Sequence, residues 1–158
     1  MFTPLLQPRL SEAAAMNFSY LKTPSGILKL FEIALVVADV VILRHQGVGG
    51  FGGTPAAITN NSYFGASVPI AALIVTPLLL AVYLAGNMNI QKSFFEPVIN
   101  AFFGASLFVY GCLAIDFYRK MSTIITIRDY GLAMGSLSLI AGFAYLADLF
   151  FAIKAMRS

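Results

Sequence analysis

Residues 127–148 read IRDYGLAMGSLSLIAGFAYLAD, and this stretch decides how the rest of the chain is interpreted. From residue 131 to residue 153 the only charged side chain is that of Asp148. At 1.5 Å of rise per residue, this run is long enough to cross a hydrocarbon layer of about 30 Å. The stretch therefore predicts a membrane-spanning helix near the C-terminus.

One side of this predicted helix carries only small side chains. At about 100° per residue, Gly131, Gly135, Ser138 and Gly142 fall within one narrow stripe. Helices in a bilayer associate through close backbone approach, which small residues permit. Gly131 and Gly135 also form a G-x-x-x-G motif, so the stripe indicates helix packing, either within one bundle or between two copies of the chain.

The composition excludes an ordinary water-facing surface. The 158 residues are 59% hydrophobic and 11% charged, with a mean hydropathy of +0.83, whereas soluble domains carry about 25% charged residues. The ten basic residues are spread along the chain and form no stripe, since only Arg119 and Lys120 are adjacent, so the net charge of +3 does not predict nucleic-acid binding. With one cysteine, Cys112, and one histidine, His45, the chain offers neither a thiolate metal cluster nor a Cys–His nucleophile. We therefore expect no catalysis, no metal and no cofactor.

Four apolar segments predict an all-α membrane protein. Short connections between consecutive spans make them antiparallel, as in an up-and-down four-helix bundle. In the third segment Gly104 and Gly111 share a face, which again indicates close helix contact. The predicted spans are residues 27–43, 68–86, 97–118 and 131–153, within a bundle of residues 26–154 that follows an N-terminal tail (1–25) and precedes a short C-terminus (155–158).

Basic residues near the spans favour cytosolic termini. With both termini inside, six basic residues lie on the cytosolic side and four lie outside. The inner group is Arg9, Lys22, Lys29, Lys92, Lys154 and Arg157, and the outer group is Arg44, Arg119, Lys120 and Arg128. The first loop, which this orientation places outside, ends near the glycosylation sequon Asn60-Asn61-Ser62, and Asn60 is a candidate for modification.

Charged residues within spans are costly and are candidates for function. The candidates here are Lys29, Glu32, Asp39, Asp116 and Asp148. In the predicted orientation they form two layers, with one group near the inner interface and Asp39 and Asp116 toward the outer one. This placement favours salt bridges that fix the order of the helices over a proton or ion pathway, which would need an ionisable group at mid-depth. The specific expectation is a pair between Asp148 and either Lys29 or Lys154.

The first loop contains a G-x-G-x-x-G sequence from Gly47 to Gly52. This motif binds a pyrophosphate only where it follows a strand and opens a helix in a βαβ unit. Here it lies between two predicted membrane helices. It therefore indicates a turning or flexible loop rather than a nucleotide site.

The fourth segment resembles the last helix of snakeskin, a family of small four-span proteins of insect smooth septate junctions. The residues that carry the resemblance run from Arg128 to Asp148 in the pattern R-x-x-G-L-A-x-G-x-L-x-x-I-x-G-x-x-Y-L-x-D. Residues 27–30 (ILKL), 41–44 (VILR) and 47–50 (GVGG) add to it. More broadly, four short spans with both ends cytosolic are similar to the MARVEL class.

The resemblance implies a non-enzymatic plasma-membrane protein of cell–cell junctions in barrier epithelia, with tetraspanin-type and single-pass adhesion proteins as partners. Homo-oligomers and lipids are further expected partners. The alternative function is that of a small accessory subunit of a transporter, channel or respiratory assembly. A third hypothesis is ion or proton conduction through Glu32 and Asp39, which the two-layer arrangement of charges does not favour.

Overall fold

The computed structural model describes residues 18–45, 60–86, 90, 93–120 and 125–157, and these residues form helices and no strand. The first element is a short 3-10 helix, η1 (Phe18–Lys22). Four long α-helices follow it: α2 (Pro24–His45), α3 (Asn60–Leu84), α4 (Phe95–Arg119) and α5 (Ile125–Arg157). The all-helical class predicted from the sequence is confirmed for the described residues.

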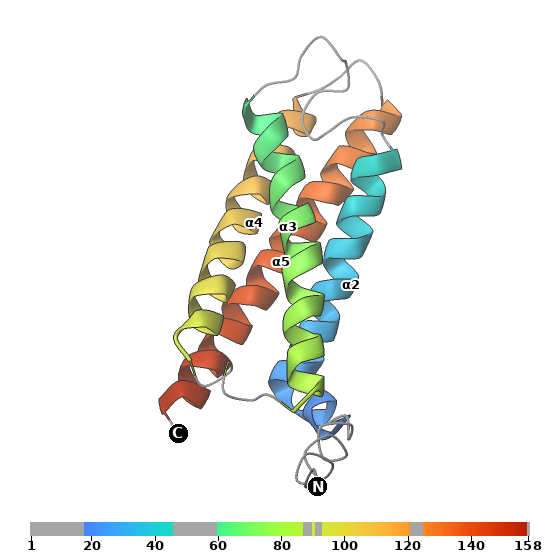
Figure 1. Cartoon of the computed structure of the whole chain (residues 1–158). Coiled ribbons are helices and arrows are strands. Elements are labelled where there is room, and N and C mark those ends of the chain that lie inside the picture. The colour runs from blue at the N-terminus through green and yellow to red at the C-terminus, as the bar shows by residue number, and fades with distance from the viewer. Residues whose placement is uncertain (1–17, 46–59, 87–89, 91–92, 121–124, 158) are drawn as a thin grey trace, which may run out of the picture.

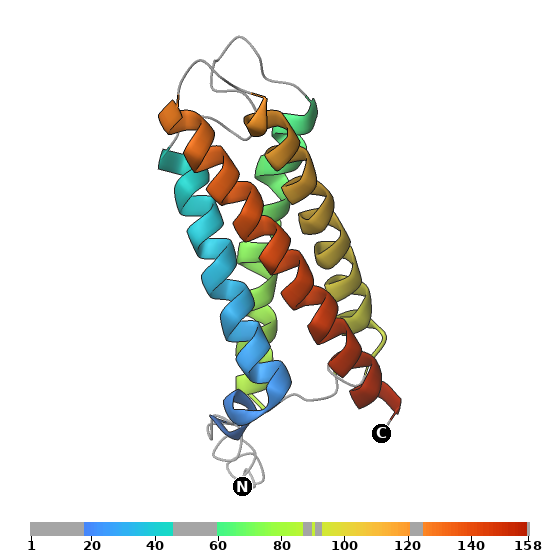
Figure 2. The ribbon, with the colours of Figure 1, turned by 180° about the vertical axis from the view of Figure 1, so that it is seen from behind.

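The four long helices run alternately up and down in one bundle (Figure 1). Helix α2 packs against α3 and α5, while α4 packs against α3 and, most extensively, against α5. Seen from behind, α5 crosses the bundle between α2 and α4 (Figure 2). The beginning of α2 and the end of α5 therefore lie at the same end of the bundle, which we call the terminal end.

The helices extend beyond the predicted spans. Helix α5 begins at Ile125 instead of residue 131, and α3 begins at Asn60 instead of residue 68. Backbone hydrogen bonding does not require apolar side chains, so a helix continues past the segment that hydropathy identifies. At its other end α3 stops at Leu84, and Gly86 adopts a positive φ of 84°, which suits a glycine that ends a helix.

Residues 18–22, which the sequence analysis assigned to the tail, pack against the bundle. Tyr20 of η1 is buried and contacts the cluster formed by Leu79, Leu80 and Tyr83 of α3. Thr23 then starts α2, because its hydroxyl oxygen accepts a hydrogen bond from the Gly26 amide at 3.1 Å. The segment predicted as the tail, residues 1–25, therefore includes η1, which packs against the bundle.

Within the described ranges, three helices are long and apolar enough to cross a membrane, as expected of a multi-pass membrane protein. They are residues Phe64–Leu84 of α3, all of α4 and all of α5. Helix α2 has 22 residues and is not among these three, because Lys29, Glu32 and Asp39 place three charged side chains within its apolar stretch. Its role as a fourth span stays a prediction.

The bundle is apolar on its outer surface as well as in its core. Val36, Ala72, Leu107 and Tyr145, one from each long helix, meet in the central core. Many large apolar side chains nevertheless point outward, which lipid tolerates and water does not. Among those at least half exposed are Ile74, Leu78, Phe102, Phe143 and Phe150.

Candidate functional site

The terminal end of the bundle contains a fully buried group of four charged residues and one asparagine. Lys29 and Glu32 come from α2, Glu96 and Asn100 from α4, and Asp148 from α5, and each has an exposed fraction of 0%. The beginnings of α2 and α4 and the end of α5 meet at this end (Figure 1). These five residues are called the charge cluster below.

Lys29 is the centre of the charge cluster. Its ammonium donates to Asp148 Oδ2 at 2.6 Å, to Asn100 Oδ1 at 2.8 Å and to Glu32 Oε2 at 3.3 Å. An ammonium has three hydrogen-bond donors, and these three contacts use all of them. The predicted pair between Lys29 and Asp148 is therefore present and joins α2 to α5.

Asp148 has a complete set of partners. Besides Lys29, its carboxylate accepts from the Ser25 hydroxyl at 2.7 Å and from the Asn100 amide at 3.0 Å. Asn100 thus donates to the carboxylate and accepts from the ammonium, which fixes the distance between α4 and the ion pair. A buried ion pair needs such additional hydrogen bonds to offset the loss of hydration.

The two glutamates are less well partnered. Glu96 Oε1 lies 3.8 Å from Lys29 Nζ, too far for a hydrogen bond, and neither carboxyl oxygen of Glu96 has a hydrogen-bond partner. Glu32 uses one oxygen on Lys29 and leaves the other, Oε1, without a partner. The hydroxyl of Tyr83 interacts with Glu96 without forming a hydrogen bond of ordinary geometry.

Helix η1 covers the charge cluster from the terminal end. The Tyr20 ring packs against Tyr83 with centroids 5.0 Å apart, and its hydroxyl lies 3.4 Å from that of Ser25. Burial raises the pKa of the Tyr20 hydroxyl above its ordinary value, so this phenol stays neutral. At Gly26 a Cβ would collide with the Tyr20 carbonyl, and glycine is therefore what allows η1 to lie this close to α2.

The other predicted charged residues do not join the charge cluster. Asp39 is buried toward the opposite end of α2 and accepts a short hydrogen bond from Ser138 of α5. Asp116 is exposed on α4, where Lys120 contacts it at 2.6 Å and Arg119 at 3.7 Å. The predicted outer layer is therefore two unrelated features, a buried helix contact and a surface ion pair.

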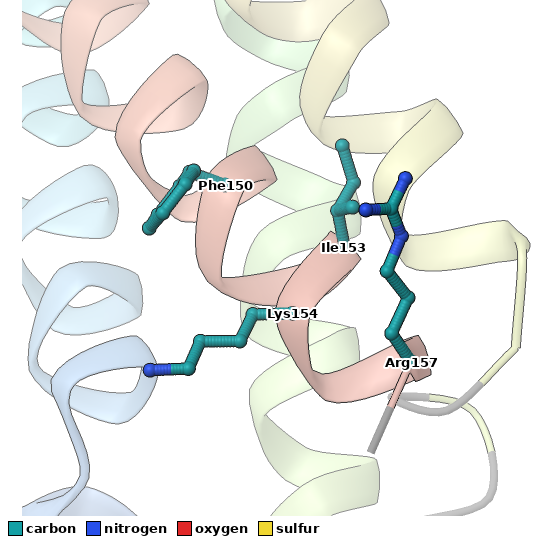
Figure 3. Close-up of a pocket in the computed structure, with 4 residues that line it drawn as sticks. All are labelled: Phe150, Ile153, Lys154 and Arg157. Carbon is teal, nitrogen blue, oxygen red and sulfur yellow. The ribbon is translucent and has the colours of Figure 1, made fainter.

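Lys154 is the alternative partner predicted for Asp148, but Asp148 is buried and pairs with Lys29 instead. The side chain of Lys154 is exposed and lines a surface groove of about 400 Å³ with Phe150, Ile153 and Arg157 (Figure 3). All four residues belong to the last turns of α5. This groove is separate from the charge cluster.

The predicted glycine faces form the contact between α4 and α5. A Cβ on Gly111 would lie 2.7 Å from the Gly135 carbonyl oxygen, and one on Gly142 would lie 2.9 Å from the Phe108 amide nitrogen. Gly104 faces Leu146 and Gly142, and Gly131 lies against the ring of Tyr118. The G-x-x-x-G motif is thus used within the chain, while Ser138 serves the contact with α2 instead.

Two predictions concern residues beyond what the structure describes. Asn60 begins α3, but its side chain lies outside the described residues, so its glycosylation stays a prediction. The glycine-rich loop at residues 47–53 also lies outside them. Across the described ranges, no three His, Cys, Asp or Glu side chains are placed to hold a metal ion.

Sequence reasoning missed several members of the site. Asn100 follows Glu96 by four residues, so both lie on one face of α4, and this polar pair in an apolar helix was the available signal. Ser25, Tyr20 and Tyr83 carried no such signal, because small polar and aromatic residues are common near helix ends.

The chain was compared with protein-family models, curated proteins and solved structures, and none of them matches it. The fold of the described residues defines the class alone, which is a helical bundle with three candidate membrane spans. The resemblance to the snakeskin family stays a prediction.

Proposed function

We propose that this protein is a non-enzymatic, four-span membrane protein whose function is lateral assembly with other membrane proteins. The observation that supports this most strongly is the distribution of polar groups. The charge cluster is buried between helices, and large apolar side chains cover the outside of the bundle. A partner in the membrane would therefore contact an apolar helical surface along the sides of this bundle.

The buried polar side chains already bind one another across the helices of the bundle. Lys29, Asn100 and Asp148 join α2, α4 and α5, and the hydrogen bond between Thr76 and Tyr145 joins α3 to α5. The glycine faces are likewise occupied by the contact between α4 and α5. Partners would therefore bind to a preformed bundle rather than complete it.

The outward surface suits transmembrane helices of other proteins. Phe102 and Phe143 are each 60% exposed, and Phe150 is 66% exposed, on neighbouring helices α4 and α5. In a bilayer such side chains gain from close packing against another helix instead of from water exclusion. We propose α2 as the fourth span, because Lys29, Glu32 and Asp39 turn inward and leave its outer face apolar.

The proposed place of action is the cell–cell junction of a barrier epithelium. This part of the proposal rests on the resemblance of the fourth segment to the snakeskin family. It implies tetraspanin-type and single-pass adhesion proteins as partners, and both termini in the cytosol. The competing proposal is an accessory subunit of a larger membrane complex, which the same apolar surface suits.

Site-specific photocrosslinking tests lateral assembly. A photoreactive phenylalanine analogue is placed at Phe143, which is outward-facing, and as a matched control at Met134, which is 1% exposed. In epithelial cells that express the tagged full chain, we expect adducts with other membrane proteins from position 143 and none from position 134. Adducts with lipid alone from position 143 would contradict the proposal.

Localisation separates the two candidate functions. A junction protein concentrates at the lateral borders between cells, and its adducts from position 143 include adhesion proteins. An accessory subunit gives adducts with one catalytic or transport complex in a fixed ratio. An even distribution through an internal membrane would overturn the junction proposal while leaving the accessory role.

A further inference from the structure

The charge cluster does not balance its charges. One ammonium, that of Lys29, lies among three carboxyl groups, those of Asp148, Glu32 and Glu96, and all four side chains are fully buried. If every carboxyl were ionised, two negative charges would lack a counter-ion. Uncompensated charges at a buried site are expensive, and such a site takes up a compensating cation or proton instead.

Hydrogen bonding shows which carboxyls are in excess. Asp148 accepts from Lys29, Ser25 and Asn100, the pattern expected of an ionised carboxylate. Three carboxyl oxygens accept no hydrogen bond, both of Glu96 and one of Glu32, and the neighbouring Tyr83 hydroxyl forms none either. Lys29 cannot supply them, because its three donors are already used.

We propose that Glu32 and Glu96 form a buried proton-binding site, in which the two carboxyls are held as neutral acids beside the Lys29–Asp148 ion pair. Two bound protons bring the site to neutrality and supply two O–H donors. This inference concerns the interior of the bundle and does not depend on the proposed role in assembly.

The groups around the two carboxyls favour a proton over a metal ion. The Lys29 ammonium lies 3.3 Å from Glu32 and 3.8 Å from Glu96, so a second cation between them would be repelled. In the part of the chain that the structure describes, no set of ligands has the arrangement of a metal site. The other titratable groups that interact with the pair are Tyr20 of η1, Tyr83 of α3, and Asp148 and Tyr145 of α5.

The bound protons make the stability of the bundle depend on pH. A folded state that holds protons which the unfolded state releases becomes less stable as the pH rises. Loss of both protons would leave two carboxylates between α2 and α4 without counter-ions. For each such proton, the folding equilibrium constant changes by at most about tenfold per pH unit.

Infrared spectroscopy of the full chain in lipid nanodiscs tests the site directly, because the carbonyl stretch of a protonated carboxyl is distinct from the bands of a carboxylate. We expect protonated-carboxyl absorption from the unaltered protein at pH 7. We expect Glu32→Gln and Glu96→Gln each to remove part of it without removing carboxylate absorption. Asp116→Asn is the matched control and should remove carboxylate absorption only, since Asp116 is exposed and paired with Lys120.

Each contrary outcome is decisive. Absence of protonated-carboxyl absorption in the unaltered protein would overturn the proposal without any variant. Loss of carboxylate absorption in the two glutamine variants would show ionised glutamates, and carboxylate bands that shift when sodium replaces potassium would show a metal cation instead.

Measurement of the free energy of unfolding as a function of pH provides a second test. The double variant Glu32→Gln/Glu96→Gln keeps the shape and neutrality of the proposed state, so it should fold at pH 7 and lose most of the decline in stability at alkaline pH. A double variant with the same decline as the unaltered protein would contradict the proposal.

Discussion

At the scale of single residues, the arrangement around Lys29 determines how α2 is held. The ammonium is 0% exposed and touches side chains from α4 and α5 as well as its own helix. Its methylene stem also brings the charge to 5.7 Å from the centre of the Tyr145 ring. A cation this deep is tolerated because all of its donors are used.

Asp148→Asn removes the main counter-ion of Lys29 and should destabilise the bundle. Breaking a buried ion pair typically costs about 3–5 kcal/mol, and we expect the lower end because Glu32 already contacts the same ammonium. The measurement is the midpoint of unfolding in detergent at pH 7. Asp116→Asn serves as the control, since its pair with Lys120 is exposed and should leave the midpoint almost unchanged.

The sequence limited the partner of Asp148 to two lysines but did not select between them. Asp148 was predicted to pair with Lys29 or Lys154, because all three were expected near one interface. The structure selects Lys29, which is fully buried and contacts Asp148 at 2.6 Å, while the side chain of Lys154 is exposed. Lys29 lies on α2, which packs against α5, whereas Lys154 follows Asp148 by six residues on α5 itself, a spacing at which two side chains of one helix do not face each other.

At the scale of elements, the contact between α4 and α5 depends on backbone approach. Gly111 faces the backbone of α5 at Gly135, and Gly142 faces the backbone of α4 at Phe108. Side chains at these positions would meet backbone atoms, which cannot move aside as a flexible side chain does. The two helices therefore stay close only while these positions are glycine.

Gly111→Ala should push α4 and α5 apart. The added Cβ would lie 2.7 Å from the Gly135 carbonyl oxygen, and overpacking of this kind costs about 1–3 kcal/mol. Thermal unfolding in detergent measures the loss. Ala105→Leu is the control on the same helix, because residue 105 is exposed and a larger side chain there should be tolerated. Equal effects of the two substitutions would show that the glycine contact does not limit stability.

At the scale of the whole molecule, each long helix runs along the length of the bundle, so its two ends lie at opposite ends of the bundle (Figures 1 and 2). Lys22 is the last residue of η1 at the terminal end, and Arg44 lies near the far end of α2. If α2 is a span, the membrane separates these two residues. This gives a direct test of the fourth span.

Cysteine labelling carries out that test. In a Cys112→Ser background, Lys22→Cys and Arg44→Cys introduce single thiols at exposed positions. A membrane-impermeant maleimide added from the cytosolic side should label position 22 and leave position 44 unlabelled until the membrane is permeabilised. Labelling of both positions from one side would show that α2 does not cross.

The sequence by itself determined that the part of the chain that the structure describes is helical, that it has four long helices and that its surface suits lipid. These are local properties, because apolar length and helical periodicity can be read within one segment. The glycine stripes of the third and fourth segments were also predictable, since small residues at helical spacing mark a packing face. Only the tertiary structure decided that Glu96 and Asn100 meet Lys29, that Tyr20 packs against Tyr83 beside them, and that Asp39 and Asp116 have unrelated surroundings. The physical reason is that the rotation of each helix about its axis is set by packing against all its neighbours at once, and residues far apart in the chain share a site only when that packing is complete.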